Sequence, residues 1–213
     1  MHKLFLDIET LPAEDEKVKT LRMLFDKKND EFDQEKFDEF INKTSFDGAF
    51  GRVLCIGYAA DDEKPQVFYN ENNEKETLRQ FWDLVNALSI SPHNMQYPDY
   101  GVQFVGHNVM DFDLRFIYQR SIVLGVKPAY EMSFARYRNY PIFDTMKEWV
   151  KWSNTGVGLE YLAIALGIPS PKDGIDGSQV AEFYKQGKIK DILEYCKRDV
   201  ETTRDVYKKI TFE

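Results

Sequence analysis

Residues 3–9 (KLFLDIE) constrain the fold more than any other segment of the chain. Leucine and isoleucine side chains alternate there with Phe5, Asp7 and Glu9, and a period of two is typical of a β-strand. Both carboxylates are therefore expected on one side of the strand. Like charges so close repel each other, and a divalent cation such as Mg²⁺ or Mn²⁺ would relieve the repulsion. The alternative is solvated surface, which describes most isolated Asp-x-Glu pairs.

The segments that follow predict an α/β fold with a mixed sheet. Further strands are expected over residues 52–60, 66–69, 102–106 and 141–144. Helices are expected over residues 77–88, 111–124, 159–166, 178–186 and 189–210, with Ser178 as a helix cap. Irregular segments are expected over residues 89–100, 126–140 and 170–177. Residues 14–43 are charged, with scattered leucine and phenylalanine, and indicate a helical excursion lying on the surface. Since no linker or repeat is visible, we expect a single domain over residues 1–213.

Charge is distributed unevenly along the chain. The net charge of −8 argues against a nonspecific nucleic-acid binder, since such proteins are usually basic. Residues 114–152, however, hold seven basic and three acidic side chains. The seven could form a basic face for a phosphate backbone: Arg115, Arg120, Lys127, Arg136, Arg138, Lys147 and Lys151. The alternative is ordinary solvated surface.

Two further features bear on the location of the protein. Cys55 and Cys196 both lie in apolar segments, which favours reduced, buried thiols over a disulfide or a metal pair. A run of about 18 apolar residues, the length that spans a bilayer, does not occur. We therefore expect a cytoplasmic protein without membrane association.

Two more groups of polar residues stand out. Tyr195 and Asp199 are four apart in the last predicted helix and so share one of its faces. Residues 106–113 (GHNVMDFD) join a predicted strand to a predicted helix, which is where clefts form in α/β sheets. The alternatives are a half-buried tyrosine beside a surface aspartate, and acidic residues that suit the first turn of a helix, as Asp111 and Asp113 would.

Taken in order, these groups resemble the three motifs of the DEDD exonucleases, a superfamily with a ribonuclease H-like fold. The motifs are Asp7-x-Glu9, then Asn108 with Phe112-Asp113, then Tyr195-x-x-x-Asp199. The resemblance covers almost the whole chain. It indicates the tyrosine branch, because the histidine branch has His where this chain has Glu194. Within that branch the chain is most similar to stand-alone exonucleases related to the proofreading domain of B-family DNA polymerases.

The resemblance implies a ribonuclease H-like three-layer fold, with a mixed five-stranded β-sheet flanked by helices. It also implies hydrolysis with two divalent metal ions, Mg²⁺ or Mn²⁺, about 3.5–4 Å apart. Asp7 would bridge the two ions, and Glu9 and Asp199 would complete the ion on the side of the nucleophile. Asp113 would hold the second ion. Tyr195 would orient the attacking water.

The resemblance also implies which residues contact the substrate. They are Thr10, Leu11, His107, Asn108 and Phe112. Leu11 and Phe112 could wedge between bases or stack on them. His107 is either a substrate contact or a structural histidine, and the residues leave both open. Asp144 ends a predicted strand near the same cleft and is expected to be structural or to lie outside the metal ligands.

The activity that the resemblance implies is that of a metal-dependent 3′–5′ exonuclease. It would hydrolyse DNA from single-stranded or frayed 3′ ends and release nucleoside 5′-monophosphates. It could serve proofreading or DNA repair, with a polymerase or a repair protein as a partner in trans. An exoribonuclease of the same fold is an alternative, because the contact to a 2′-hydroxyl cannot be read from the residues. A non-catalytic nucleic-acid- or protein-binding module is a third, although all five expected site residues are present.

Overall fold

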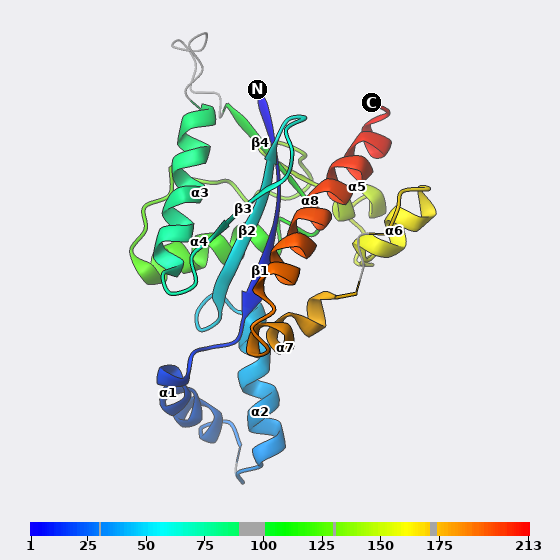
Figure 1. The fold of residues 1–213 in the computed structure, drawn as a ribbon. Helices are drawn as coiled ribbons and strands as arrows, with labels where there is room; N and C mark the ends of the chain where they lie inside the picture. The colour runs from blue at the N-terminus through cyan, green and yellow to red at the C-terminus, as the bar shows by residue number, and fades with distance from the viewer. Residues whose placement is uncertain (30, 90–100, 130, 171–173) are drawn as a thin grey trace.

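The computed structural model describes residues 1–29, 31–89, 101–129, 131–170 and 174–213. A five-stranded sheet has helices on both faces (Figure 1). Its strands are β1 (His2–Leu11), β2 (Arg52–Ala60), β3 (Gln66–Tyr69), β4 (Val102–Gly106) and β5 (Ile142–Asp144). The helices are α1 (Asp15–Asp26), α2 (Gln34–Lys43), α3 (Glu74–Ser89), α4 (Asp113–Leu124), α5 (Thr145–Val150), α6 (Leu159–Ala165), α7 (Val180–Lys185) and α8 (Ile189–Thr211). The short 3-10 turns η1 (Thr44–Phe46) and η2 (Gly177–Gln179) precede β2 and α7.

The strand order is β3-β2-β1-β4-β5, which places β1 at the centre of the sheet. β1 pairs antiparallel with β2 and parallel with β4, so the sheet is mixed as predicted. Along β1, Asp7 lies opposite Gly57 and Glu9 lies opposite Cys55. The pairing shifts between Glu9 and Thr10, and irregularities of this kind often lie beside active sites because they re-aim side chains.

The alternation in β1 divides the core into two layers. Leu4 and Leu6 pack with residues of α3 and α4 on one face of the sheet. Phe5, on the other face, packs edge-on against Tyr207 of α8, with ring centroids 5.5 Å apart. Asp7 and Glu9 share the face of Phe5, so they lie beneath α8. The predicted α/β class, with a mixed five-stranded sheet between layers of helices, is confirmed.

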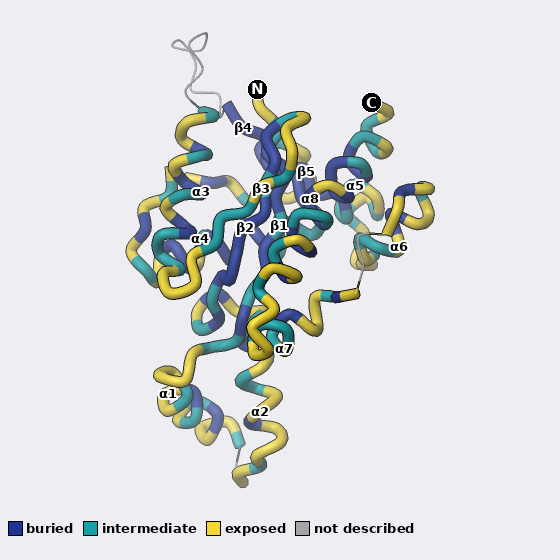
Figure 2. The backbone as a smooth tube through the Cα atoms, viewed as in Figure 1, coloured by how far each residue is buried: buried dark blue, intermediate teal, exposed yellow. Residues whose placement is uncertain are grey.

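The helices α1 and α2 and the turn η1 together form a projection that we call the arm. The predicted excursion is helical, but it does not lie flat on the surface: α1 and α2 pack together and stand out from the body (Figures 1 and 2). Their contact is aromatic, with Phe25 5.2 Å from Phe37 and 5.6 Å from Phe40 between ring centroids. The arm therefore has a small apolar core of its own.

Several predicted boundaries need correction. Ser178 does not cap the helix before α8: the carboxylate of Asp176 accepts the N–H of Ser178, and α7 begins only at Val180. The helix expected from residue 111 begins at Asp113. No pattern in the sequence indicated α5, which begins where the Asp144 side chain caps it. Of the predicted irregular segments, residues 90–100, 130 and 171–173 lie outside the described residues.

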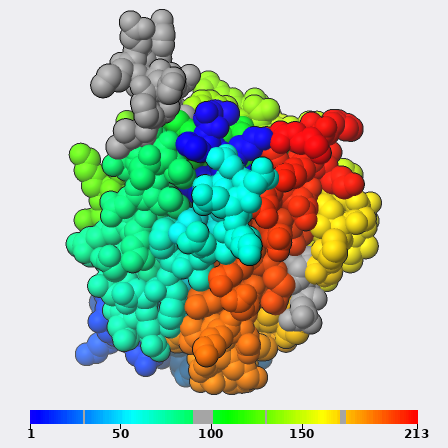
Figure 3. Space-filling model, turned by 45° about the horizontal axis from the view of Figure 1, so that its top comes forward, coloured from blue at the N-terminus to red at the C-terminus, as the bar shows by residue number. Residues whose placement is uncertain are grey.

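The two ends of the chain meet at one edge of the molecule (Figure 3). Lys3 Nζ lies 2.8 Å from the Glu213 carboxylate, and the Tyr207 hydroxyl lies 3.3 Å from the same group. β1 starts at this edge and runs away from it, so its C-terminal end, with Asp7 and Glu9, lies toward the arm (Figure 1). Within the described residues, no helix has the length and apolarity needed to span a bilayer.

Candidate active site

Acidic side chains from three elements converge where β1 passes under α8. Asp7 and Glu9 come from β1, and Tyr195 and Asp199 come from the buried face of α8. These four line one cleft of about 770 Å³, a volume typical of ligand sites. The remaining predicted carboxylate, Asp113, is buried at the first turn of α4, and it contacts β1 between Asp7 and Glu9 without lining the cleft. The structure thus brings the five predicted site residues together.

Burial and mutual repulsion dominate the electrostatics of these carboxylates. Burial raises the pKa of Asp7 well above its usual range, and the charges of Asp199, Asp113 and Glu9 raise it further. Burial is also the main cause of the raised pKa of Glu9. The donor set is therefore a cluster of hard oxygen ligands under repulsion, and such a set fits a divalent cation.

Asp113 is anchored to the strand that carries the first motif. Its Oδ1 accepts the backbone N–H of Ile8, between Asp7 and Glu9, at 3.0 Å. Burial raises the pKa of Asp113 to about 7, although this hydrogen bond acts in the opposite direction. The bond fixes the distance between α4 and β1, so it sets the relative position of the carboxylates.

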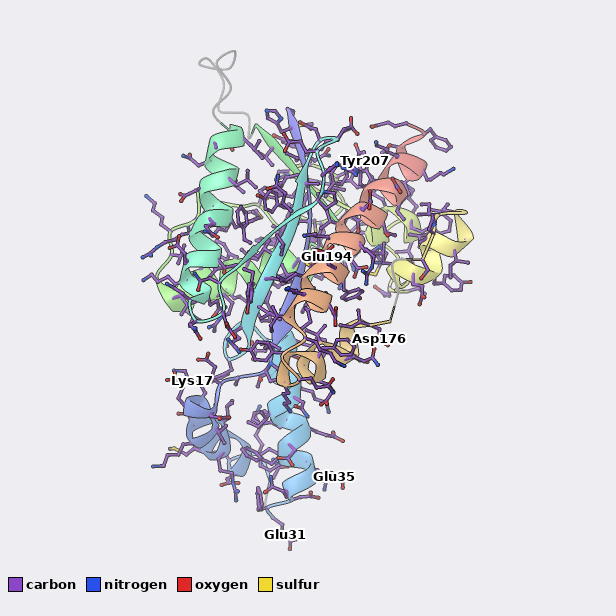
Figure 4. The ribbon with its side chains drawn as sticks, viewed as in Figure 1. Lys17, Glu31, Glu35, Asp176, Glu194 and Tyr207 are labelled. Atoms are coloured by element: carbon purple, nitrogen blue, oxygen red, sulfur yellow. The ribbon has the colours of Figure 1, made fainter. Side chains whose placement is uncertain are left out.

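Tyr195 is held as a neutral phenol beside Asp199. Burial is the main cause of its raised pKa, and the negative charge of Asp199 and a hydrogen bond to that carboxylate add to it. A phenol with a raised pKa keeps its proton at neutral pH and acts as a hydrogen-bond donor. Glu194, the position that selects between the two branches, is exposed on α8 and pairs with Lys197 at 2.8 Å (Figure 4).

Cys196 offers a possible metal ligand that the sequence analysis did not place in the site. Its Sγ lies 3.6 Å from Asp7 Oδ2, and ligand atoms of Asp7, Glu9 and Cys196 all lie within 4.8 Å of one another. In the sequence, its position next to Tyr195 was the feature that could have placed it there. Cys196 is buried, as expected for a reduced thiol in an apolar segment.

Asp144 organises the loop that leads into the second motif. Its carboxylate accepts the backbone N–H groups of Asn108, Met110, Met146 and Lys147 at 3.0–3.1 Å. Asn108 has a φ of 61°, a left-handed conformation that asparagine tolerates better than most residues. These bonds give Asp144 a structural role, in line with its expected place outside the metal ligands.

His107 lies behind this loop, outside the lining of the cleft. Its Nδ1 is 2.9 Å from Thr145 Oγ1 and its Nε2 is 2.7 Å from the carbonyl oxygen of Val157. Burial lowers its pKa, which keeps the ring neutral. Both ring nitrogens are used inside the protein, and this favours the structural alternative over a substrate contact.

Of Thr10 and Leu11, which were both expected to contact substrate, only Thr10 lines the cleft. Leu11 is only 3% exposed and packs against Leu54 and Ile192 in the core, so it supports the floor of the cleft without entering it. Thr10 lines the cleft, but its hydroxyl donates to the carbonyl oxygen of Ser45 at 2.7 Å. That bond joins β1 to the arm.

Two walls of the cleft were not identified in the sequence. One wall comes from the arm and includes Lys43 and Phe46, and the other comes from η2 and α7 and includes Ser178 and Lys185. Phe112, predicted from the second motif, lies at the arm side and contacts Phe46. The residues of these walls are distant in the sequence from Asp7 and Glu9, and the fold brings them to the cleft, so no local sequence pattern could reveal them.

The predicted basic face is smaller than the sequence indicated. Arg120 is buried and pairs with Glu74 at 2.8 Å, which removes it from any surface. Arg115, Arg136 and Lys147 instead surround the single carboxylate of Asp111, at 3.6, 3.5 and 2.8 Å. Three cations on one carboxylate leave an excess of two positive charges next to Phe112.

Comparisons with known proteins agree with this architecture. The chain is similar to a solved family B DNA polymerase from the hyperthermophilic archaeon Pyrobaculum calidifontis, with a TM-score of 0.66 and 17% sequence identity. The similarity covers 99% of this chain and 24% of the polymerase chain, so this chain spans about a quarter of that polymerase. No curated protein matches.

The mixed sheet, flanked by helices and matched to that polymerase, defines a PolB exonuclease-like fold. The chain belongs to the family of predicted 3′-5′ exonucleases related to the exonuclease domain of PolB, which it matches over residues 49–212. The predicted resemblance to exonucleases related to the proofreading domain of B-family DNA polymerases is therefore confirmed. The matched range starts after β1 and the arm, so Asp7, Glu9 and the arm lie outside it.

Proposed function

We propose that this protein is a metal-dependent 3′–5′ exonuclease that hydrolyses single-stranded DNA ends to nucleoside 5′-monophosphates. The observation that carries the proposal is the convergence of Asp7, Glu9 and Asp199 with the Tyr195 hydroxyl in one cleft, with Asp113 beneath them. Family membership supports nuclease chemistry, and similarity to a DNA polymerase makes DNA the first substrate to test.

Each site residue has a defined part in this proposal. Asp7, Glu9, Asp113 and Asp199 would hold two divalent ions, Mg²⁺ or Mn²⁺. When bound, such ions lower the pKa of a water and stabilise the departing oxygen. The phenol of Tyr195 would hold the attacking water in line with the scissile bond. Water would add to phosphorus, the bond to the 3′-oxygen would break, and that oxygen would leave with a proton.

The decisive experiment compares four oligonucleotides of one sequence, with 3′-free and 3′-blocked ends in DNA and in RNA. With Mg²⁺ or Mn²⁺ we expect stepwise shortening of the 3′-free DNA, release of 5′-monophosphates and no reaction in EDTA. Shortening of the RNA alone would identify an exoribonuclease. Binding without any cleavage would identify a non-catalytic module. A polymerase or repair protein that acts in trans can then be sought by adding candidates to the same assay.

Replacement of Tyr195 with phenylalanine should slow turnover by about 10²-fold, the usual contribution of a group that positions or transfers a proton. Binding of a single-stranded oligonucleotide should change little, because the ring and its packing against Ile192 remain. Single-turnover cleavage and fluorescence anisotropy measure the two quantities separately. A collapse of binding with unchanged cleavage of the bound strand would remove Tyr195 from its assigned role.

Charge reversal of Arg136 and Arg138 should weaken strand binding and flatten its dependence on salt. Each phosphate that the protein no longer neutralises reduces the slope of log K against log[salt] by about 0.7 for a single strand. Affinity measured at several salt concentrations gives this slope. Reversal of the exposed Lys19 on α1 is a matched control and should leave the slope unchanged. An unchanged slope in the Arg136 and Arg138 variant would place the strand elsewhere.

A further inference from the structure

Phe46 is an exposed aromatic residue at the mouth of the carboxylate cleft. It ends the arm, the residue is 74% exposed, and it lines the same cleft as Asp7 and Asp199. A single exposed apolar residue is common on protein surfaces. This one is distinguished by its position and by how firmly its backbone is held.

The backbone around Phe46 is fixed to the body by two side chains. Thr10, directly after the first motif, donates its hydroxyl to the carbonyl oxygen of Ser45 at 2.7 Å. Thr44 is 4% exposed, and its Oγ1 accepts the N–H of Ala13 at 2.8 Å. Phe46 is therefore tied to the same strand as Asp7 and Glu9, and its distance from the carboxylates does not depend on the outer part of the arm. In Figure 4, Glu31 and Glu35 mark the outer part of the arm, which lies away from the body.

Phe46 also has an aromatic neighbour that connects it to the core. Its ring lies 6.2 Å from that of Phe112, at an interplanar angle of 50°, and Phe112 lies 5.8 Å from the buried Phe116. Phe46 and Phe112 line both the carboxylate cleft and a smaller cavity of about 180 Å³ that Arg115 also lines. The two rings thus form a ridge between the carboxylates and the cations around Asp111.

A ridge of this chemistry suits one kind of ligand. Nucleic-acid bases stack on aromatic side chains whatever their sequence, and cations beside such a platform attract the phosphates that connect the bases. A base can use the platform only when it is unpaired and unstacked from its neighbour. A paired 3′ end would have to fray before it could occupy the ridge.

We propose that Phe46, together with Phe112, forms a stacking platform for an unpaired base within the last three nucleotides of a strand whose 3′ end lies at the carboxylates. This inference rests on the proposed exonuclease function, and it adds to it a contact for the unpaired bases of the 3′ end. Phe46 precedes residues 49–212, so the platform combines a residue inside the family match with one outside it. The arm thereby supplies substrate selection.

The test measures strand affinity in an Asp199→Asn background, where the strand is not degraded. Phe46→Ala should weaken binding of a single-stranded oligonucleotide roughly 5- to 150-fold, the range for loss of one stacked base. Phe46→Trp should restore it. Phe212→Ala removes a phenylalanine that is 97% exposed at the far end of α8, and it should have no effect. The thermal midpoint of each variant reports whether the fold is intact.

A set of oligonucleotides with one abasic residue identifies the stacked base. The abasic residue is placed at the first, second or third position from the 3′ end. At one of these positions the penalty of Phe46→Ala should disappear, because the base it would have stacked is absent. Affinity that is unchanged in Phe46→Ala, or a penalty that is equal for every abasic oligonucleotide, would overturn the platform. If the wild-type protein cuts no 3′ end while the penalty depends on position, the exonuclease proposal fails and the platform stands.

Discussion

Asp199→Asn is expected to abolish metal-dependent degradation of 3′ ends, with a loss on the order of 10³-fold or more. Asp199 lines the cleft with Asp7 and hydrogen-bonds Tyr195. The substitution therefore removes a proposed metal ligand and disturbs Tyr195, the residue proposed to hold the attacking water. Loss of several kcal/mol of transition-state stabilisation corresponds to a rate loss of this size. Degradation of a 3′-labelled and a 5′-labelled strand, followed over time, measures it.

The matched control is Asp191→Asn, an exposed aspartate on the same helix outside the cleft. It should keep full activity, and neither variant should unfold at a lower temperature than the wild type. Retention of activity in Asp199→Asn would overturn the site assignment. Loss of activity in both variants would show that α8 itself had been disturbed.

Asp7→Asn is expected to raise the thermal midpoint of the metal-free protein. Burial and three neighbouring carboxylates raise the pKa of Asp7, so its charged form destabilises the fold. Each kcal/mol of relief corresponds to about 2–4 °C for a chain of this size. Asp111→Asn should do the opposite, because Lys147, Arg136 and Arg115 lower the pKa of Asp111 and stabilise its charge. Thermal unfolding in EDTA compares the two.

The same charges predict how pH and metal act on stability. A carboxyl whose pKa is raised by folding keeps the fold most stable at low pH, and that stability is lost as the pH rises through the folded pKa. For Asp113 the loss falls between its ordinary value of 3.8 and about 7. The contribution of these carboxyls to stability should therefore give the protein in EDTA a higher thermal midpoint at pH 5.5 than at pH 8.

At pH 8, addition of a divalent metal should raise the thermal midpoint and so offset the loss of stability caused by the charged carboxylates. Saturation to about 100 times the Kd contributes about 2.7 kcal/mol, or roughly 5–10 °C. The gain should shrink at pH 5.5, where protons compete for the ligands, and it should be lost in Asp7→Asn. Equal stabilisation by metal in wild type and Asp7→Asn would mean that the metal binds elsewhere.

The sequence was informative where the determining interactions are local. The alternation in residues 3–9 placed Asp7 and Glu9 on one face, and helical spacing placed Tyr195 beside Asp199. Such patterns depend on the geometry of single elements, which neighbouring residues determine. The three motifs, taken in order, then supplied the family.

The remaining features depend on contacts between distant residues. Thr10 lines the cleft, as a substrate contact would, but its bond to Ser45, which the arm brings back to β1, could not be predicted. Arg120 was counted as surface because its partner Glu74 lies 46 residues away. His107 and Asp144 likewise join the loop after β4 to the start of α5 and the end of β5, through hydrogen bonds that no periodicity reveals. The exposure of Phe46 could not be read either, because it is set by the direction in which the arm leaves the sheet.

The meeting of the chain ends has a practical consequence for experiments on this protein. Lys3 and Glu213 are joined at the edge where β1 begins, whereas the cleft opens near the end of that strand (Figure 1). A tag, a surface linker or a fused protein attached at either terminus would therefore leave the cleft and the arm accessible to a strand. Immobilisation through both termini at once would hold the molecule in one orientation, with its substrate-facing end directed into solution.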